Sequence, residues 1–109
     1  MEPGIKDLLV KARELITEKE HWTTEAYGRS VSGSIVVRAQ LKKASCFCAT
    51  GALIRAWQAI GNLGVDEYLD AVGLLEKSME MNILIYNDSH THEEVLNAFD
   101  QVIQTVSSD

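Results

Sequence analysis

The chain has 109 residues, 46% of them hydrophobic and 24% charged, with one proline and a formal net charge of −6. This length suits one domain, and this composition excludes a disordered or collagen-like chain. Charges interrupt every apolar stretch before it reaches the length of a membrane span, and no signal peptide or disulfide framework is visible. We therefore expect a single cytoplasmic domain over residues 1–109.

The charges are distributed unevenly along the chain. Residues 1–60 carry 9 basic and 6 acidic side chains, whereas residues 61–109 carry 1 and 10, giving balances of +3 and −9. No acid lies between Ala26 and Val65. The bases in this segment are Arg29, Arg38, Lys42, Lys43 and Arg55. They are too sparse for a nucleic-acid-binding face, so we expect the two parts to attract each other within one molecule or between copies.

The first third of the chain predicts a helix followed by a long loop. Apolar residues recur at helical spacing from Ile5 to Ile16, with Pro3 in the first turn, which predicts a helix over about 3–20. The loop, over about 22–44, is rich in Gly, Ser and Thr and has no helical period. Within it, residues 34–40 are β-branched and favour a short strand about as much as a loop or helical turn, because no partner strand is evident.

A second helix is predicted from Ser45, as its N-cap, to Gly61. Its apolar line consists mostly of alanine, and small residues let a neighbouring backbone approach closely. We therefore expect this helix to lie at the centre of the fold, with Gly51 accepted for the same reason.

Two further helices complete the expected domain. The apolar period that begins at Val65 continues to Tyr86, with a possible break near Met81-Asn82. Thr91 and Glu94 form the sequence of a capping box before a final amphipathic stripe. The predicted fold class is all-α: a compact four-helix domain with one long irregular loop that includes a short strand as an option.

The two cysteines and two of the histidines offer a weak metal-site hypothesis. Cys46, Cys48, His90 and His92 have the right number for structural zinc. A helix starting at Ser45 would point the two thiols about 160° apart, and only an extended C-x-C would let them share an ion. Burial of both cysteines as small apolar residues is favoured, and we expect no metal and no other cofactor.

The same residues suggest a catalytic alternative. Cys48 near a helix start would have a lowered pKa, with His90 or His92 as a base and Asp88 or Asn87 as the orienting group. Any chain with three histidines contains residues of these types, so they do not by themselves indicate an active site. A cysteine-dependent enzyme that uses Cys48 is therefore kept as an alternative.

The acid-free loop offers a site for a small anion. Over residues 28–43 its glycines and hydroxyls precede a helix start, and helix starts bind anions. The ligand-binding candidates are Arg29, Arg38, Lys42, Lys43 and Arg55. The loop matches neither the P-loop nor the dinucleotide fingerprint, so the alternative is a small anionic ligand such as a nucleotide.

Several short motifs suggest a family. Trp22, C-A-T-G-A-L at 48–53, Y-N-D at 86–88 and T-H-E-E-V-L-N-A-F-D at 91–100 occur in this order. With them the chain resembles an uncharacterised family of small bacterial and phage-associated proteins, which has no assigned activity. The resemblance implies a bacterial or phage cytoplasmic setting and a shared framework of residues. These are Cys48, Gly51, Asn87, Asp88 and Thr91.

Helix caps and buried apolar stripes explain nearly every distinctive residue of the sequence, so no active site is needed to account for them. The favoured hypothesis is a non-enzymatic interaction or accessory protein, which binds a protein partner or self-associates as a homo-oligomer and engages neither nucleic acid nor membrane. The anionic-ligand binder and the cysteine-dependent enzyme stand as its alternatives.

Overall fold

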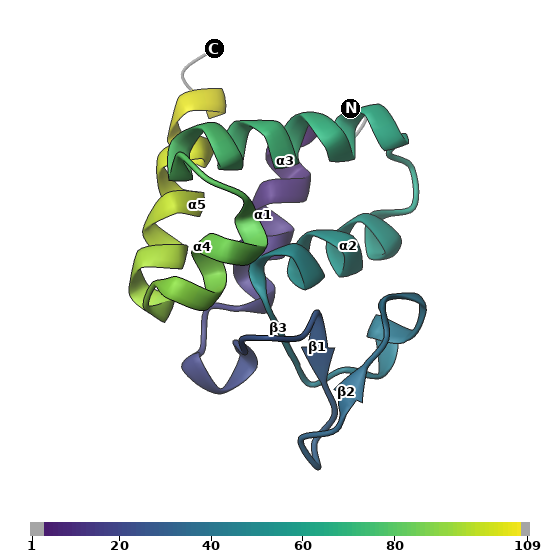
Figure 1. Cartoon of the computed structure of the whole chain (residues 1–109). Helices are drawn as coiled ribbons and strands as arrows, with labels where there is room; N and C mark the ends of the chain where they lie inside the picture. Colours follow the sequence, from purple (N-terminus) through teal and green to yellow (C-terminus); the bar gives the residue numbers. More distant parts are fainter. Residues whose placement is uncertain (1–3, 108–109) are drawn as a thin grey trace.

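A computed structural model describes residues 4–107, which form a mostly helical domain with a small sheet at one end (Figure 1). The helices and 3-10 turns are α1 (Ile5–Leu15), η1 (Lys19–His21), η2 (Arg38–Lys43), α2 (Ala49–Ile60), α3 (Val65–Met79), α4 (Ile83–Ser89) and α5 (His92–Ser107). The predicted helical class is confirmed, with five α-helices in the described residues where four were expected. None of these helices is long and apolar enough to cross a membrane.

The difference in helix number arises between Met79 and Ile83. Glu80 adopts a left-handed conformation with φ 60°, which ends α3. Asn82 then caps α4 by accepting the N–H groups of Leu84 and Ile85 at 2.8 and 3.4 Å. The break expected near Met81-Asn82 is therefore real, and the apolar period that crosses it belongs to two helices.

Helix α2 occupies the centre of the fold, as its alanine-rich line predicts. It packs against α1, α3 and α4, and it ends at Gly61 with φ 79°. The buried residues form one cluster that draws on every helix. The largest of its fully buried apolar side chains are Phe99, Leu8, Leu9, Ile16, Leu41, Leu53, Leu75, Ile83 and Val95.

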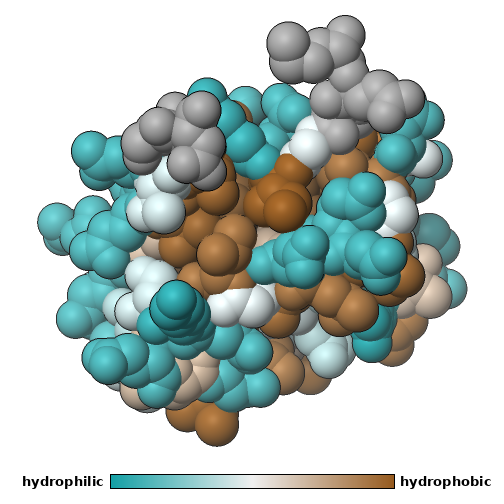
Figure 2. All heavy atoms as spheres, turned by 90° about the horizontal axis from the view of Figure 1, so that it is seen from above, coloured by the Kyte–Doolittle hydropathy of each residue, from teal (hydrophilic) through white to brown (hydrophobic). Residues whose placement is uncertain are grey.

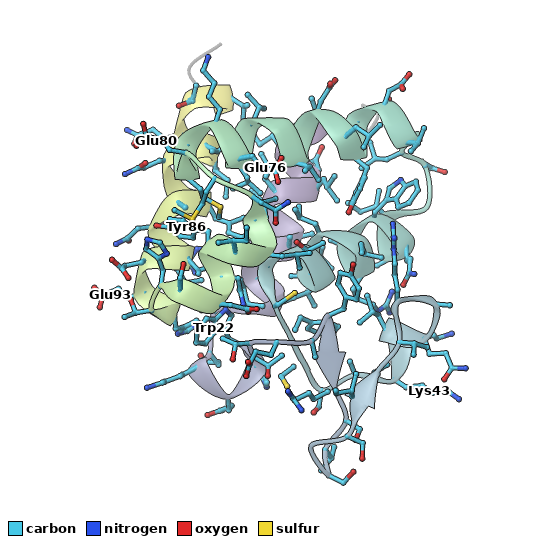
Figure 3. The ribbon with its side chains drawn as sticks, viewed as in Figure 1. Trp22, Lys43, Glu76, Glu80, Tyr86 and Glu93 are labelled. Atoms are coloured by element: carbon cyan, nitrogen blue, oxygen red, sulfur yellow. The ribbon has the colours of Figure 1, made fainter. Side chains whose placement is uncertain are left out.

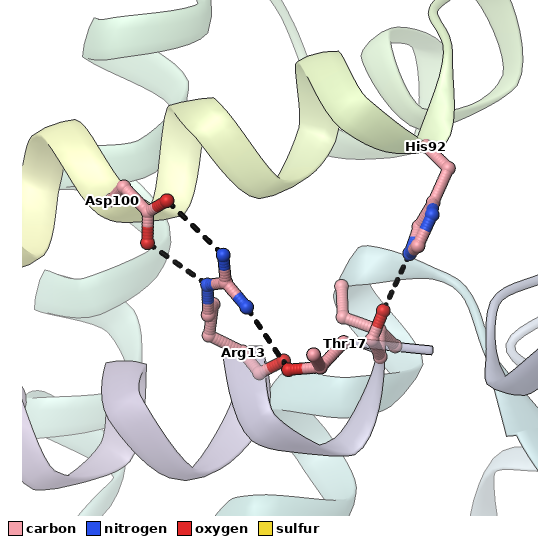
Figure 4. Close-up of polar contacts among 5 residues, drawn as sticks. Arg13, Thr17, His92 and Asp100 are labelled. Atoms are coloured by element: carbon pink, nitrogen blue, oxygen red, sulfur yellow. Dashed lines mark hydrogen bonds and ion pairs between the residues drawn. The ribbon is translucent and has the colours of Figure 1, made fainter. Parts of the chain in front are cut away.

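The first and last helices are joined by polar contacts as well as by packing (Figure 4). Arg13 donates to both carboxylate oxygens of Asp100, at 2.9 and 3.2 Å, and to the hydroxyl of Thr17 at 3.0 Å. The predicted capping box of α5 is confirmed by reciprocal bonds between Thr91 and Glu94 at 2.8 and 3.1 Å. Helix α1 ends at Leu15, five residues before the predicted end, because the polar segment after Ile16 turns away from the core.

Three two-residue strands form the sheet, in the order β2-β1-β3 with both pairs antiparallel. They are β1 (Gly28–Arg29), β2 (Ile35–Val36) and β3 (Cys46–Phe47). Of the options for residues 34–40, the strand is confirmed at Ile35–Val36 and the helical turn at residues 38–40, where η2 begins. The partner of β2 is β1, which lacks the β-branched residues by which strands are recognised. Pairing of Cys46–Phe47 with β1 also delays α2, so Cys48 caps this helix and the predicted Ser45 cap is wrong.

Candidate functional site

The side chain of Asn87 connects three segments that are distant in sequence. It is completely buried, and its Oδ1 accepts hydrogen bonds from Trp22 Nε1 at 2.8 Å and from the backbone N–H of Ala49 at 2.9 Å. Its Nδ2 donates to the carbonyl oxygen of Thr23 at 3.0 Å and to Asp88 Oδ1 at 3.3 Å. The start of α2, the segment after α1 and the end of α4 are therefore held together by one amide.

The start of α2 fits closely against Tyr27. The backbone N–H of Cys48 donates to the Tyr27 carbonyl oxygen at 3.1 Å, and the Cys48 thiol accepts the N–H of Gly51 at 3.3 Å. A Cβ atom at Gly51 would overlap that same carbonyl oxygen. Glycine is required here by a close approach of two backbones, as the small residues of this helix predicted.

Cys48 lies in a setting that suits packing. Its exposed fraction is 1%, and burial raises the pKa of its thiol, while the nearby charge of Asp88 adds to the rise. Cys48 and Asp88 line a pocket of about 280 Å³, together with Glu25, Ala26, Tyr27 and Leu84. A thiol with a raised pKa is a poor nucleophile at neutral pH.

The candidate histidines lie elsewhere. His90 and His92 line a separate hollow of about 550 Å³ beside Trp22. The ring of His90 stacks on Tyr86 with centroids 3.7 Å apart, and its Nδ1 lies 3.0 Å from the Tyr86 carbonyl oxygen. His92 Nε2 donates to the Ile16 carbonyl oxygen at 2.6 Å (Figure 4). The structure thus brings Asp88 to Cys48, and it places both histidines in structural contacts away from the thiol.

The geometry of the cysteines differs from the prediction. Cys46 lies in β3 and Cys48 has an extended backbone, so the C-x-C segment is not helical and its two side chains share a face. The Cys46 thiol donates to the Arg29 carbonyl oxygen at 3.8 Å. Within residues 4–107, no three histidine, cysteine or acidic side chains gather closely enough to hold a metal.

The five predicted ligand-binding bases do not form one group. The guanidinium of Arg29 donates to Thr23 Oγ1 at 3.1 Å and to the carbonyl oxygens of Gly33 and Thr24 at 3.2 and 3.4 Å, which ties the loop together. Arg55 is half-buried in α2. The remaining three, Arg38, Lys42 and Lys43, lie exposed on η2, where Lys43 points away from the body (Figure 3).

We call residues 28–43 the basic arm. Besides its bases, it exposes three large apolar side chains, Val31 at 93%, Ile35 at 64% and Val37 at 59%. Sequence reasoning missed these apolar residues as a surface feature. The signal was the alternation in S-I-V-V, because Ile35 and Val37 project from one face of an extended segment while the half-buried Val36 faces the other way.

Together, these features define a small, mostly helical domain with a tightly connected core and a basic arm that exposes apolar side chains. The chain belongs to a family of unknown function (DUF6197), whose model matches residues 1–105. The predicted membership of an uncharacterised family is thereby confirmed. A search of curated proteins and a search of solved structures each found no match.

Proposed function

We propose that this protein is a non-enzymatic interaction protein that binds an acidic protein surface through its basic arm. One observation carries the proposal: Val31, Ile35 and Val37 are exposed on the same short segment as the exposed bases of η2. Apolar side chains gathered at a surface mark an interaction site more often than isolated ones do. No acid accompanies them anywhere in residues 28–43.

The base of the arm is held in shape, which favours binding. Leu41 is completely buried, so η2 is anchored in the core. A side chain at Gly28 would contact Ala44, Leu41 and the Cys46 carbonyl oxygen at 2.9 Å, which shows how tightly the base of the arm is packed. A surface ordered before binding loses less conformational entropy when its partner arrives.

The bases of the arm differ in their partners. Arg38, Lys42 and Lys43 form no ion pair within residues 4–107, whereas Arg29 bonds to oxygens of the loop itself. Unpaired charges of one sign speed encounter with a surface of the opposite sign and suppress binding to wrong partners. Hence an acidic partner with an apolar centre fits this arm best.

In-cell photo-crosslinking tests the proposal. A photo-crosslinking amino acid is placed at Val31 or, as a control, at the exposed Asn97 of α5. We expect adducts from Val31 only, and their loss when Arg38, Lys42 and Lys43 are all changed to Glu in a variant that still folds. Equal adduct yields at the two positions, or adducts from Val31 that survive the charge reversal, would contradict the proposal.

Binding of a small anion by the arm is the second candidate, because three bases lie within the six residues of η2 and form no ion pair in the part of the chain that the structure describes. The start of α2 was also predicted to bind the anion through its backbone N–H groups. Two of these groups already have partners in the protein: the Ala49 N–H donates to Asn87, and the Gly51 N–H donates to the Cys48 thiol. Thermal unfolding with a nucleotide panel tests this candidate, since a ligand at a hundred times its Kd adds about 2.7 kcal/mol of stability.

For the setting, we propose the cytoplasm of a bacterium or a phage-infected cell. The family resemblance supports the host, and the two free cysteines support a reducing compartment. The cysteine-dependent enzyme has the least support, because it needs a reactive thiol where burial raises the pKa of Cys48.

A further inference from the structure

The outer face of α3 contains a glycine that the fold does not require. Gly73 is exposed in the middle of the helix, and a Cβ atom there would have nothing within 4 Å. Glycine is among the poorest helix formers, so this position lowers helix propensity with no internal packing in return. Its missing side chain helps to leave a hollow of about 490 Å³, lined on α3 by Leu69, Asp70, Gly73, Leu74 and Lys77.

Apolar and acidic side chains surround this glycine. Val65 lies about two turns before Gly73 and Leu69 about one turn before it, and their side chains are 54% and 55% exposed. Asp66 and Asp70 are exposed beside them. We call these five residues the α3 face. Figure 2, which views the molecule from the side where α3 lies in Figure 1, shows hydrophobic residues gathered there among hydrophilic ones.

The α3 face and the basic arm are complementary. Residues 65–70 carry three acids and no base, whereas residues 28–43 carry four bases and no acid, and both expose large aliphatic side chains. In Figure 1, α3 lies along the top of the molecule and the arm at the bottom right, with α2 between them. Consistently, burial raises the pKa of Tyr68 in α3, and the nearby charge of Arg38 partly offsets this rise.

We infer that the α3 face binds the basic arm of a second copy of this chain, in a reciprocal twofold dimer. This inference rests on the proposed function, because it takes the arm as the binding surface. In a closed pair, the twofold axis places each arm on the other copy's α3, so that each copy uses both patches. An interface takes roughly 20 to 30 residues a side, which five residues of α3 alone do not supply.

Gly73 then has a role in the dimer. Without a side chain it lets the partner's arm approach the helix backbone between Leu69 and the acids. The aliphatic contacts are expected to supply most of the affinity, because exposed ion pairs contribute little by themselves. The charges determine the relative orientation of the two copies and their rate of association, so the dimer should weaken as salt is added.

Complementary charge swaps test the pairing by sedimentation velocity of the full chain. One variant changes Asp66 and Asp70 to Lys, and the other changes Arg38, Lys42 and Lys43 to Glu. We expect each variant alone to lose dimerisation by at least about tenfold in Kd, and a mixture of the two to form a heterodimer, since both contacts then join opposite charges.

Gly73→Gln provides a second test, because it should change thermal stability and dimerisation in opposite directions. In dilute, monomeric protein we expect its thermal midpoint to rise by about 2–4 °C, because glutamine is the better helix former, while dimerisation at higher concentration weakens. The control is Asn97→Gln on the exposed side of α5, which should change neither. A Gly73→Gln variant that dimerises like the wild type would overturn the inference.

Failure of the inference can be told apart from failure of the proposed function. If the wild type is monomeric at every concentration while Val31 still gives crosslinks that depend on the arm charges, the arm binds a different protein and the α3 face is not its site. If the arm variant dimerises as well as the wild type, the inference is wrong, and the proposed function is decided by the Val31 crosslinks alone.

Discussion

Replacement of Asn87 by leucine should remove a large share of the free energy of unfolding. Leucine keeps the branched shape of asparagine but carries larger methyl groups, so the change deletes the hydrogen bonds without leaving a cavity. Three groups then lose their partner: the indole N–H of Trp22, the backbone N–H of Ala49 and the carbonyl oxygen of Thr23. A buried polar group without a partner costs about 1–3 kcal/mol.

Since Trp22 and Thr23 are half-buried and can recover bonds to water, we expect a total loss of about 3–5 kcal/mol rather than the upper limit. Urea unfolding followed by circular dichroism and tryptophan fluorescence measures it. Asn97→Leu, on the exposed side of α5, is the matched control and should shift stability by no more than about 0.5 kcal/mol. Trp22→Phe, which removes one donor, should lose less than Asn87→Leu. The reasoning would be refuted if Asn87→Leu lost under about 1 kcal/mol.

Three further outcomes are expected. Gly51→Ala should lose at least about 2 kcal/mol in the same urea assay, because its methyl group would overlap the Tyr27 carbonyl oxygen, and a wild-type midpoint would contradict that contact. In native protein near neutral pH, a thiol reagent should label Cys46 much faster than Cys48, because burial raises the pKa of the Cys48 thiol and blocks access to it. Variants with serine in place of each cysteine show which labelling phase belongs to which thiol. Fast labelling of Cys48 would support the catalytic alternative. The backbone N–H in the α5 capping box lowers the pKa of Glu94 below its ordinary value of about 4.3. The contribution of Glu94 to the free energy of unfolding is therefore present above that value and is lost as pH falls through the lower pKa of the folded state. When stability is measured from neutral pH to about pH 3, Glu94→Gln should remove this part of its pH dependence.

Local signals in the sequence predicted the helices well. The capping box at Thr91 and the glycine at 61 marked helix ends because their bonds join residues a few positions apart. The start of α2 was mispredicted because a nonlocal contact decided it. Ser45 is a good N-cap by type, yet pairing of β3 with β1 holds residues 46–47 extended and moves the cap to Cys48.

The site shows the same division between local and nonlocal information. The sequence identified Asn87, Asp88, Cys48 and Gly51 as members of one framework, but their contacts join positions about 25 to 65 residues apart and no spacing rule gives them. Likewise, the bases of the arm were visible in the sequence. That Arg29 turns inward while Arg38 stays in solvent depends on the loop's own carbonyl groups.

The hydrogen bonds around Tyr27 also determine which parts of the chain unfold together. Tyr27 and Thr23 lie in the segment that leads into the arm, and their carbonyl oxygens bind the start of α2 and the amide of Asn87. The hairpin tip near Val31 can therefore open alone, whereas the base of the arm opens only with the first turn of α2. Amide protons at residues 30–34 should exchange with solvent long before those of Cys48 and Ala49. A loop that looks peripheral is, at its base, part of the cooperative unit that the core helix defines.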